Sequence, residues 1–177
     1  MAARAIIGIL LGVLFAPVVY LLLVSIGDPT AFSNWFWSMT SDFNTFLSSW
    51  VNAGVNSTIA PLATTVSHPY SLILGFGPTY GILSEWIPTY APALITWALV
   101  GAWAGAIERS AGRGLGVGIG CWLGWLIIGL LVFFIAPTII VPLIVGFVDL
   151  LLGMLMTAIV VLVVAVIFGA MTKSEEF

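Results

Sequence analysis

Residues Leu115–Ala136 read LGVGIGCWLGWLIIGLLVFFIA, a continuous apolar run that contains no charged side chain. A helix rises 1.5 Å per residue, so about 20 residues cross the roughly 30 Å hydrocarbon core of a bilayer. Within a membrane, a helix also satisfies every backbone polar group inside its own segment. This run therefore predicts a membrane-spanning helix.

The whole chain shares this character. Of its 177 residues, 62% are hydrophobic and 6% are charged, whereas an average soluble domain has roughly 25% charged residues. No water-soluble fold of this size hides so much apolar surface, so the excess must face lipid. We expect an all-α integral membrane protein.

Three further runs are long enough to span, which predicts a bundle of four transmembrane helices in one membrane domain, residues 1–177. The first run has a basic Arg4 ahead of it and could be a signal peptide, but it is longer than a typical signal core, so we expect a retained helix. Pro137 and Pro142 bracket the turn before the last span. The predicted spans are residues 5–26, 91–107, 115–136 and 143–171.

The basic residues predict the orientation. All four lie at places that four spans put on one side of the membrane, namely Arg4, Arg109, Arg113 and Lys173. Residues 27–90 contain no Lys or Arg. The positive-inside rule therefore predicts a multi-pass protein of the cell membrane with both termini in the cytoplasm, residues 27–90 outside and a cytoplasmic tail at 172–177.

An aromatic stripe marks the predicted outer segment. Between Phe32 and Trp50 bulky side chains recur at steps of four and three, the spacing of one helix face. The opposite face is polar, with Asp42 as its single charge. We expect an amphipathic helix in the outer membrane interface or over the bundle mouth, as a structural cap or a docking site for a partner. The predicted interface-cap residues are Phe32, Phe36, Met39, Phe43, Phe46 and Trp50.

Other features of the outer segment are weaker signals. Asn56-Ser57-Thr58 matches the N-glycosylation sequon, which makes Asn56 a candidate acceptor. Residues 71–84 are apolar but too short to span; a packed outer loop is the favoured reading and a re-entrant loop the other. His68 has no second histidine or cysteine nearby, so we expect turn packing and not a metal site.

Glycines recur every four residues in the third predicted span and also mark the other spans. Glycine lets helix backbones approach closely and gain dispersion contacts that lipid tails do not supply. We expect these positions to pack helix against helix inside a compact bundle and, where small surface remains, against other subunits. The predicted helix-packing residues are Gly8, Gly12, Gly101, Gly105, Gly112, Gly116, Gly120, Gly124, Gly146 and Gly153.

Asp149 is the only ionisable residue well inside a predicted span. Placing an ionised carboxylate at the bilayer centre costs at least ~2.5 kcal/mol of free energy, so such residues usually have a structural or functional role. Gly146, Gly153 and Thr157 share its helix face, which we expect to point into the bundle. Three readings stay open: a buried hydrogen bond that sets helix register, a solvated interfacial position, or a cation or proton path that passes Asp149 and Thr157.

The groups that most enzymes need are scarce. The chain has one histidine, one cysteine and no pair of carboxylates in any span. It therefore lacks the residues for haem ligation, metal-assisted hydrolysis or a nucleophilic triad. The net charge of −3 and the lack of a basic run argue against nucleic-acid binding. We expect neither an enzyme acting alone nor a cofactor.

Three functional hypotheses remain. The leading one is a small accessory or structural membrane subunit that assembles by glycine-mediated helix packing into a homo- or hetero-oligomeric complex, with membrane lipids and other subunits or itself as partners. The second is a cation or proton channel or transporter subunit with Asp149 on the path. The third is a protein that senses the membrane interface through residues 32–50.

Overall fold

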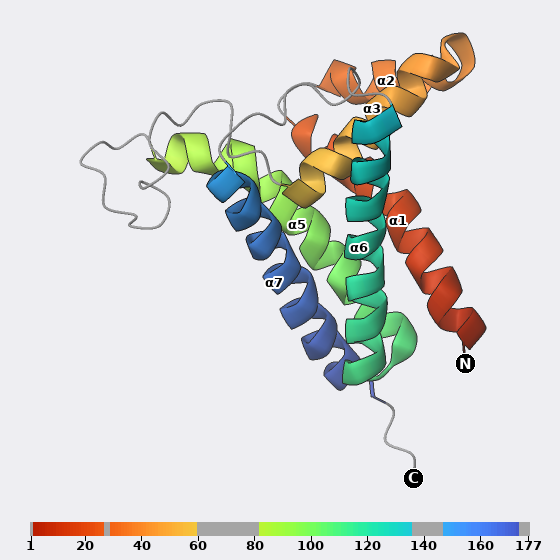
Figure 1. The fold of residues 1–177 in the computed structure, drawn as a ribbon, viewed down its shortest axis with the longest axis vertical. Helices are drawn as coiled ribbons and strands as arrows, with labels where there is room; N and C mark the ends of the chain where they lie inside the picture. Colours follow the sequence, from red (N-terminus) through yellow and green to blue (C-terminus); the bar gives the residue numbers. More distant parts are fainter. Residues whose placement is uncertain (1, 27–28, 60–81, 136–146, 174–177) are drawn as a thin grey trace.

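The computed structural model describes residues 2–26, 29–59, 82–135 and 147–173, and the described chain is entirely helical (Figure 1). It contains six helices within these ranges. They are α1 (Ala2–Val24), α2 (Pro29–Ser41), α3 (Phe43–Ile59), α5 (Ile82–Glu108), α6 (Ala111–Ile135) and α7 (Phe147–Met171).

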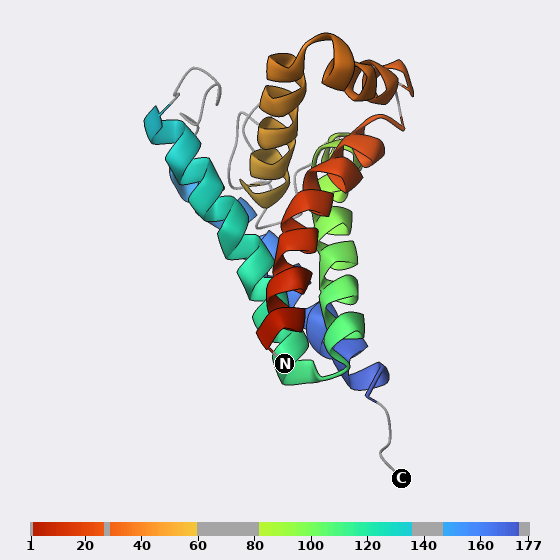
Figure 2. The same cartoon turned by 90° about the vertical axis from the view of Figure 1, so that its right-hand side faces the viewer.

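Four of these helices are long and apolar enough to cross a membrane. Each overlaps one predicted span, and their apolar stretches are Ala3–Val24 in α1, Ala91–Glu108 in α5, Ala111–Leu131 in α6 and Gly153–Met171 in α7. Successive spans run in opposite directions, and the start of α1, the end of α7 and the turn between α5 and α6 lie at one end of the bundle (Figures 1 and 2). We call this the basic end, because Arg4, Arg109, Arg113 and Lys173 lie there.

The turn at the basic end is shorter than the predicted loop. α5 continues to Glu108 and α6 begins at Ala111, so Arg109 and Ser110 alone connect them. Arg109 has φ 49°, the left-handed conformation that often ends a helix, and its N–H donates to Gly105 O at 3.0 Å. Gly114 N–H donates to Ser110 O at 2.8 Å and starts the first turn of α6. This tight turn places α5 and α6 antiparallel and side by side.

The predicted continuous helix from Phe32 to Trp50 is wrong at Asp42, where the chain bends between α2 and α3. Asp42 Oδ1 accepts hydrogen bonds from Asn44 N and Thr45 N, each at 3.2 Å, and Oδ2 accepts one from Thr45 Oγ1 at 2.6 Å. These bonds, first of all the one from the Thr45 hydroxyl, hold the pKa of Asp42 below its ordinary value. Asp42 thus caps the start of α3. This cap divides the segment into two helices, although the aromatic spacing predicts a single one.

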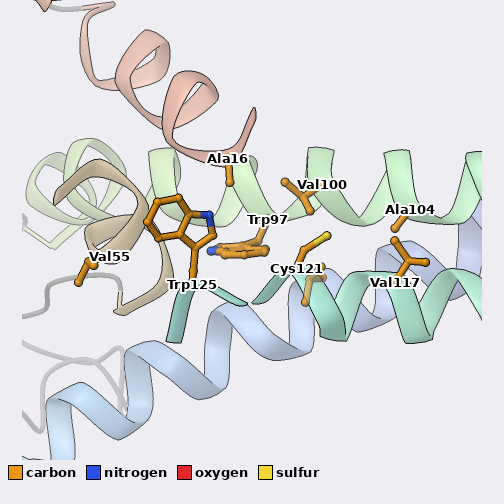
Figure 3. Packing of buried hydrophobic residues seen from close by; sticks show 9 residues of the cluster. Ala16, Val55, Trp97, Val100, Ala104, Val117, Cys121 and Trp125 are labelled. Atoms are coloured by element: carbon orange, nitrogen blue, oxygen red, sulfur yellow. The ribbon is translucent and has the colours of Figure 1, made fainter. Parts of the chain in front are cut away.

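α3 does not stay with the outer segment. Its first half lies beside α2, and its second half runs down into the bundle between α6 and α1 (Figure 2). Val55 is a member of the hydrophobic core, together with Ala16 of α1, Trp97 of α5 and Trp125 of α6 (Figure 3). Within the described part of residues 27–90, α3 packs into the bundle and α5 begins at Ile82, ahead of the predicted second span. The side of the membrane on which residues 27–90 lie stays a prediction.

Candidate functional site: a helix end held inside the bundle

The last turn of α3 ends against side chains from three spans. Helices leave their last carbonyl groups without partners, and at membrane depth no water is available to satisfy them. Side chains of α5 and α7 donate to two of these carbonyls in α3, and α6 supplies the flanking rings. We call this set, Trp97, Trp122, Trp125 and Thr157, the α3 socket.

Trp97 of α5 meets the end of α3 from one side. The whole residue is buried, with 0% exposure, and its Nε1–H donates to Ser57 O at 2.9 Å. Ser57 is itself buried, and its hydroxyl donates back to Gly54 O at 2.8 Å. The indole thus provides both apolar bulk and the one donor that this carbonyl needs.

Thr157 of α7 meets the next carbonyl. Its Oγ1 donates to Thr58 O at 2.7 Å, and the same oxygen accepts a hydrogen bond from Trp122 Nε1 of α6 at 3.0 Å. The hydroxyl also lies 3.2 Å from Gly153 O and 3.1 Å from Met154 O. A hydroxyl carries a single proton, so the shortest contact, to Thr58, is the bond that links α7 to α3.

Trp125 of α6 lies against the backbone of α3. A Cβ built at Gly54 would overlap the Trp125 ring, so only glycine permits this contact. The ring of Trp50 contacts the same indole edge-on, with 4.9 Å between centroids, and Trp125 Nε1 donates to Val13 O at 2.9 Å. Trp97 and Trp125 lie next to each other between the helices in Figure 3. They fill the space where α1, α3, α5 and α6 meet.

The socket lies inside the apolar part of the bundle. Trp97 is six residues into the α5 stretch that begins at Ala91, and Thr157 is four residues into the α7 stretch that begins at Gly153. α3 therefore begins at the surface of the bundle, and its last described turn is enclosed by side chains of α5, α6 and α7.

Six of the predicted packing glycines lie against another helix. A Cβ built at Gly101 would lie 2.7 Å from Val161 O, and one at Gly105 would lie 2.5 Å from Ala165 O, so α5 and α7 touch backbone to backbone. Gly8 and Gly12 of α1 face Val117 and Cys121 of α6, and Gly120 and Gly124 of α6 face Ile9 and Val13 of α1.

Of the remaining predicted glycines, Gly112 and Gly116 do not pack against another helix of the described chain, and the packing role of Gly146 and Gly153 stays a prediction. A Cβ at Gly112 or Gly116 would meet nothing within 4 Å among the described residues, and both are exposed. Gly153 is buried beside Thr157, whereas Gly146 lies outside the described residues. Gly114, which we did not select, comes closest to α5: its Cβ would lie 2.7 Å from Gly105 Cα. The small residues of α6 therefore serve two faces: Gly120 and Gly124 lie against α1, whereas Gly114 and Gly118 lie against the α5–α7 pair.

The interface-cap residues divide between two environments. Phe32 and Phe46 contact Trp35, with ring centroids 5.4 and 5.0 Å away, and Trp35 Nε1 donates to Phe46 O at 3.3 Å. Trp35 therefore joins α2 to α3, although it lies off the predicted stripe. Trp50 contacts Trp125 of the socket, while Phe36, Met39 and Phe43 are exposed. We call α2 and the first turns of α3, residues 29–47, the aromatic arm.

Two polar predictions have different outcomes. Asp149 lies in the first turn of α7, but its side chain is outside the described residues, so its three readings stay predictions. Asn56 is exposed, whereas Thr58 of the same sequon is buried and its hydroxyl donates to Gly54 O at 2.8 Å. The folded bundle therefore encloses the hydroxyl that completes the sequon. His68 and residues 71–81 also lie outside the described residues.

No group of three metal-ligating side chains occurs within the described ranges. Comparisons with protein-family models, curated proteins and solved structures found no match. The site is a structural connection: the continuous helix α3 carries the aromatic arm at one end and is hydrogen-bonded into the bundle at the other.

Proposed function

We propose that this chain is a small accessory or structural subunit of a membrane protein complex, located in the cell membrane. In the proposed orientation the basic end faces the cytoplasm and the aromatic arm faces outward. The exposure of all four basic residues at one end of the bundle supports this orientation.

The observation that carries the proposal is the contrast between a filled interior and an exposed aromatic arm. Trp97 and Trp125 are both 0% exposed at the centre of the bundle, and their indole groups are hydrogen-bonded. In the arm, by contrast, Trp37 is 65% exposed and Phe43 is 60% exposed. Exposed apolar side chains outside the predicted spans mark surfaces that contact a protein or a membrane.

The connection between arm and bundle fits a subunit that holds a partner in place. α3 is an unbroken helix from Phe43 to Ile59, so a partner bound at the arm is positioned relative to all four spans. Most of the glycines with close neighbours contact other helices of this same chain. We therefore assign partner contact to the arm and not to a glycine ridge.

A purification from native membrane tests this proposal. The tagged chain, extracted with its lipids in polymer discs, is expected to give particles heavier than one 18.8 kDa chain with its lipid, with a constant stoichiometry of partner or copies. Trp37→Ala is expected to reduce that association at least tenfold, as loss of a well-packed interface tryptophan does. Mass photometry and protein identification measure both quantities.

Trp103→Ala is the matched control, because Trp103 is also exposed but lies on the bundle, where its ring contacts Phe15. Its association is expected to match the wild type. Monomeric particles without any copurifying protein would contradict the subunit proposal. If W37A kept its partners but bound vesicles more weakly, the arm would be a membrane-interface element instead.

A further inference from the structure

The basic end carries four exposed, positively charged side chains. Arg4, Arg109, Arg113 and Lys173 are all exposed, and none forms an ion pair within the described part of the chain. Glu108, the acidic residue next to Arg109, is only 7% exposed and its Oε1 is enclosed without a hydrogen-bond partner, whereas Glu175 and Glu176 lie outside the described residues. Glu108 therefore does not neutralise the arginines.

Two of these arginines border a stretch of bare helix backbone. Gly112, Arg113 and Gly116 are spaced so that they lie toward one side of the first turns of α6. Arg109 lies in the turn just before that helix, and all four residues are exposed. Neither glycine has a neighbour within 4 Å of its Cβ position. We call these four residues the arginine–glycine face. Beyond it, the same side of α6 continues with the exposed apolar residues Leu123 and Ile127.

We propose that the arginine–glycine face binds an anionic phospholipid. The lipid phosphate contacts Arg109 and Arg113, which are suited to phosphate oxygens by their planar donor groups. One acyl chain lies along Gly112 and Gly116 toward Leu123. Clustered basic residues at the ends of membrane spans are a recurring recognition pattern for anionic headgroups.

Charge favours lipid over a second copy of this chain at the arginine–glycine face. Copies in one membrane share an orientation, so a symmetric contact across this face would set arginines against arginines at the same depth. Such like-charge contact is unfavourable. An anionic headgroup supplies the opposite charge at that depth and brings the apolar chain that the glycines can accommodate. The inference does not depend on the aromatic arm having a protein partner.

Native mass spectrometry of the purified, delipidated full chain tests the proposal. The protein is titrated with phosphatidylglycerol and with phosphatidylcholine of identical acyl chains. Tighter binding of phosphatidylglycerol is expected, and Arg113→Gln is expected to weaken it about fivefold, from the roughly 1 kcal/mol that one cation contributes near an anionic lipid. Gly116→Leu is expected to weaken it as well without a change in charge, because the new side chain occupies the acyl position.

Lys173→Gln is the matched control: it removes one charge at the same end but off the arginine–glycine face, so binding is expected to stay within about twofold. Gly116→Leu is expected to leave thermal unfolding unchanged, because its Cβ meets nothing within 4 Å. Equal weakening in K173Q and R113Q would overturn the proposal, since attraction would then be unspecific. Unchanged lipid binding in R113Q with loss of a copurifying protein would also overturn it and assign the face to that protein.

Discussion

Gly105→Ala is expected to be among the most destabilising single-methyl changes in this chain. The added Cβ would lie 2.5 Å from Ala165 O and 2.6 Å from Gly169 N, and both atoms are backbone. Backbone cannot rotate away as a flexible side chain does, so α5 and α7 must move apart. Gly114 is affected too, because its Cβ position is already 2.7 Å from Gly105 Cα.

Overpacking of this kind costs about 1–3 kcal/mol, and more where the backbone must shift. The expected result is a fall in the midpoint of thermal unfolding of several degrees, measured by tryptophan fluorescence in lipid discs. Gly116→Ala is the control, because it adds the same methyl to the neighbouring helix, where nothing lies within 4 Å. Equal unfolding midpoints for G105A and G116A would contradict the close approach of α5 and α7.

Thr157→Val is expected to loosen the end of α3. Valine keeps the shape of threonine but removes the hydroxyl that donates to Thr58 O at 2.7 Å and accepts from Trp122 Nε1 at 3.0 Å. Each buried polar group left without a partner costs about 1–3 kcal/mol. Because two groups lose their partner at once, the loss of stability is expected to exceed that of an ordinary buried threonine.

Thr96→Val provides that comparison. Thr96 is also fully buried, but its hydroxyl donates only to Pro92 O in its own helix, at 2.7 Å. Its removal leaves no donor or acceptor of another helix unpaired. Thermal unfolding of both variants in lipid discs measures the difference, and a T157V protein no less stable than T96V would show that the bond to Thr58 contributes nothing.

The spans were predictable from sequence because their signal is long and one-dimensional. About 20 apolar residues without a charge have few alternatives to a membrane helix, and α1, α5, α6 and α7 each supply such a run. Span ends were less predictable: α5 begins at Ile82, within a stretch whose Ser, Thr and Pro content resembles a loop.

The entry of α3 into the bundle could not be predicted from the sequence in the same way. Residues 43–59 contain as many polar as apolar side chains along much of their length, so no hydropathy signal indicates entry into the bundle. Partners for the end of α3 come from Trp97 and Thr157, 40 and 99 residues away along the chain. One local signal existed: Gly54, Ser57 and Thr58 form a small-residue patch next to Trp50, which is typical of close helix packing in membranes.

Hydrogen–deuterium exchange of the wild-type protein in lipid discs tests the central claim that α3 terminates inside the bundle. The amides of Trp50–Ile59 are expected to exchange as slowly as those of the membrane-spanning stretches of α5 and α6, because they are enclosed by the α3 socket. The amides of α2, in the exposed arm, are expected to exchange much faster. Exchange of residues 50–59 at the rate of α2 would contradict the enclosure of this part of α3 in the bundle.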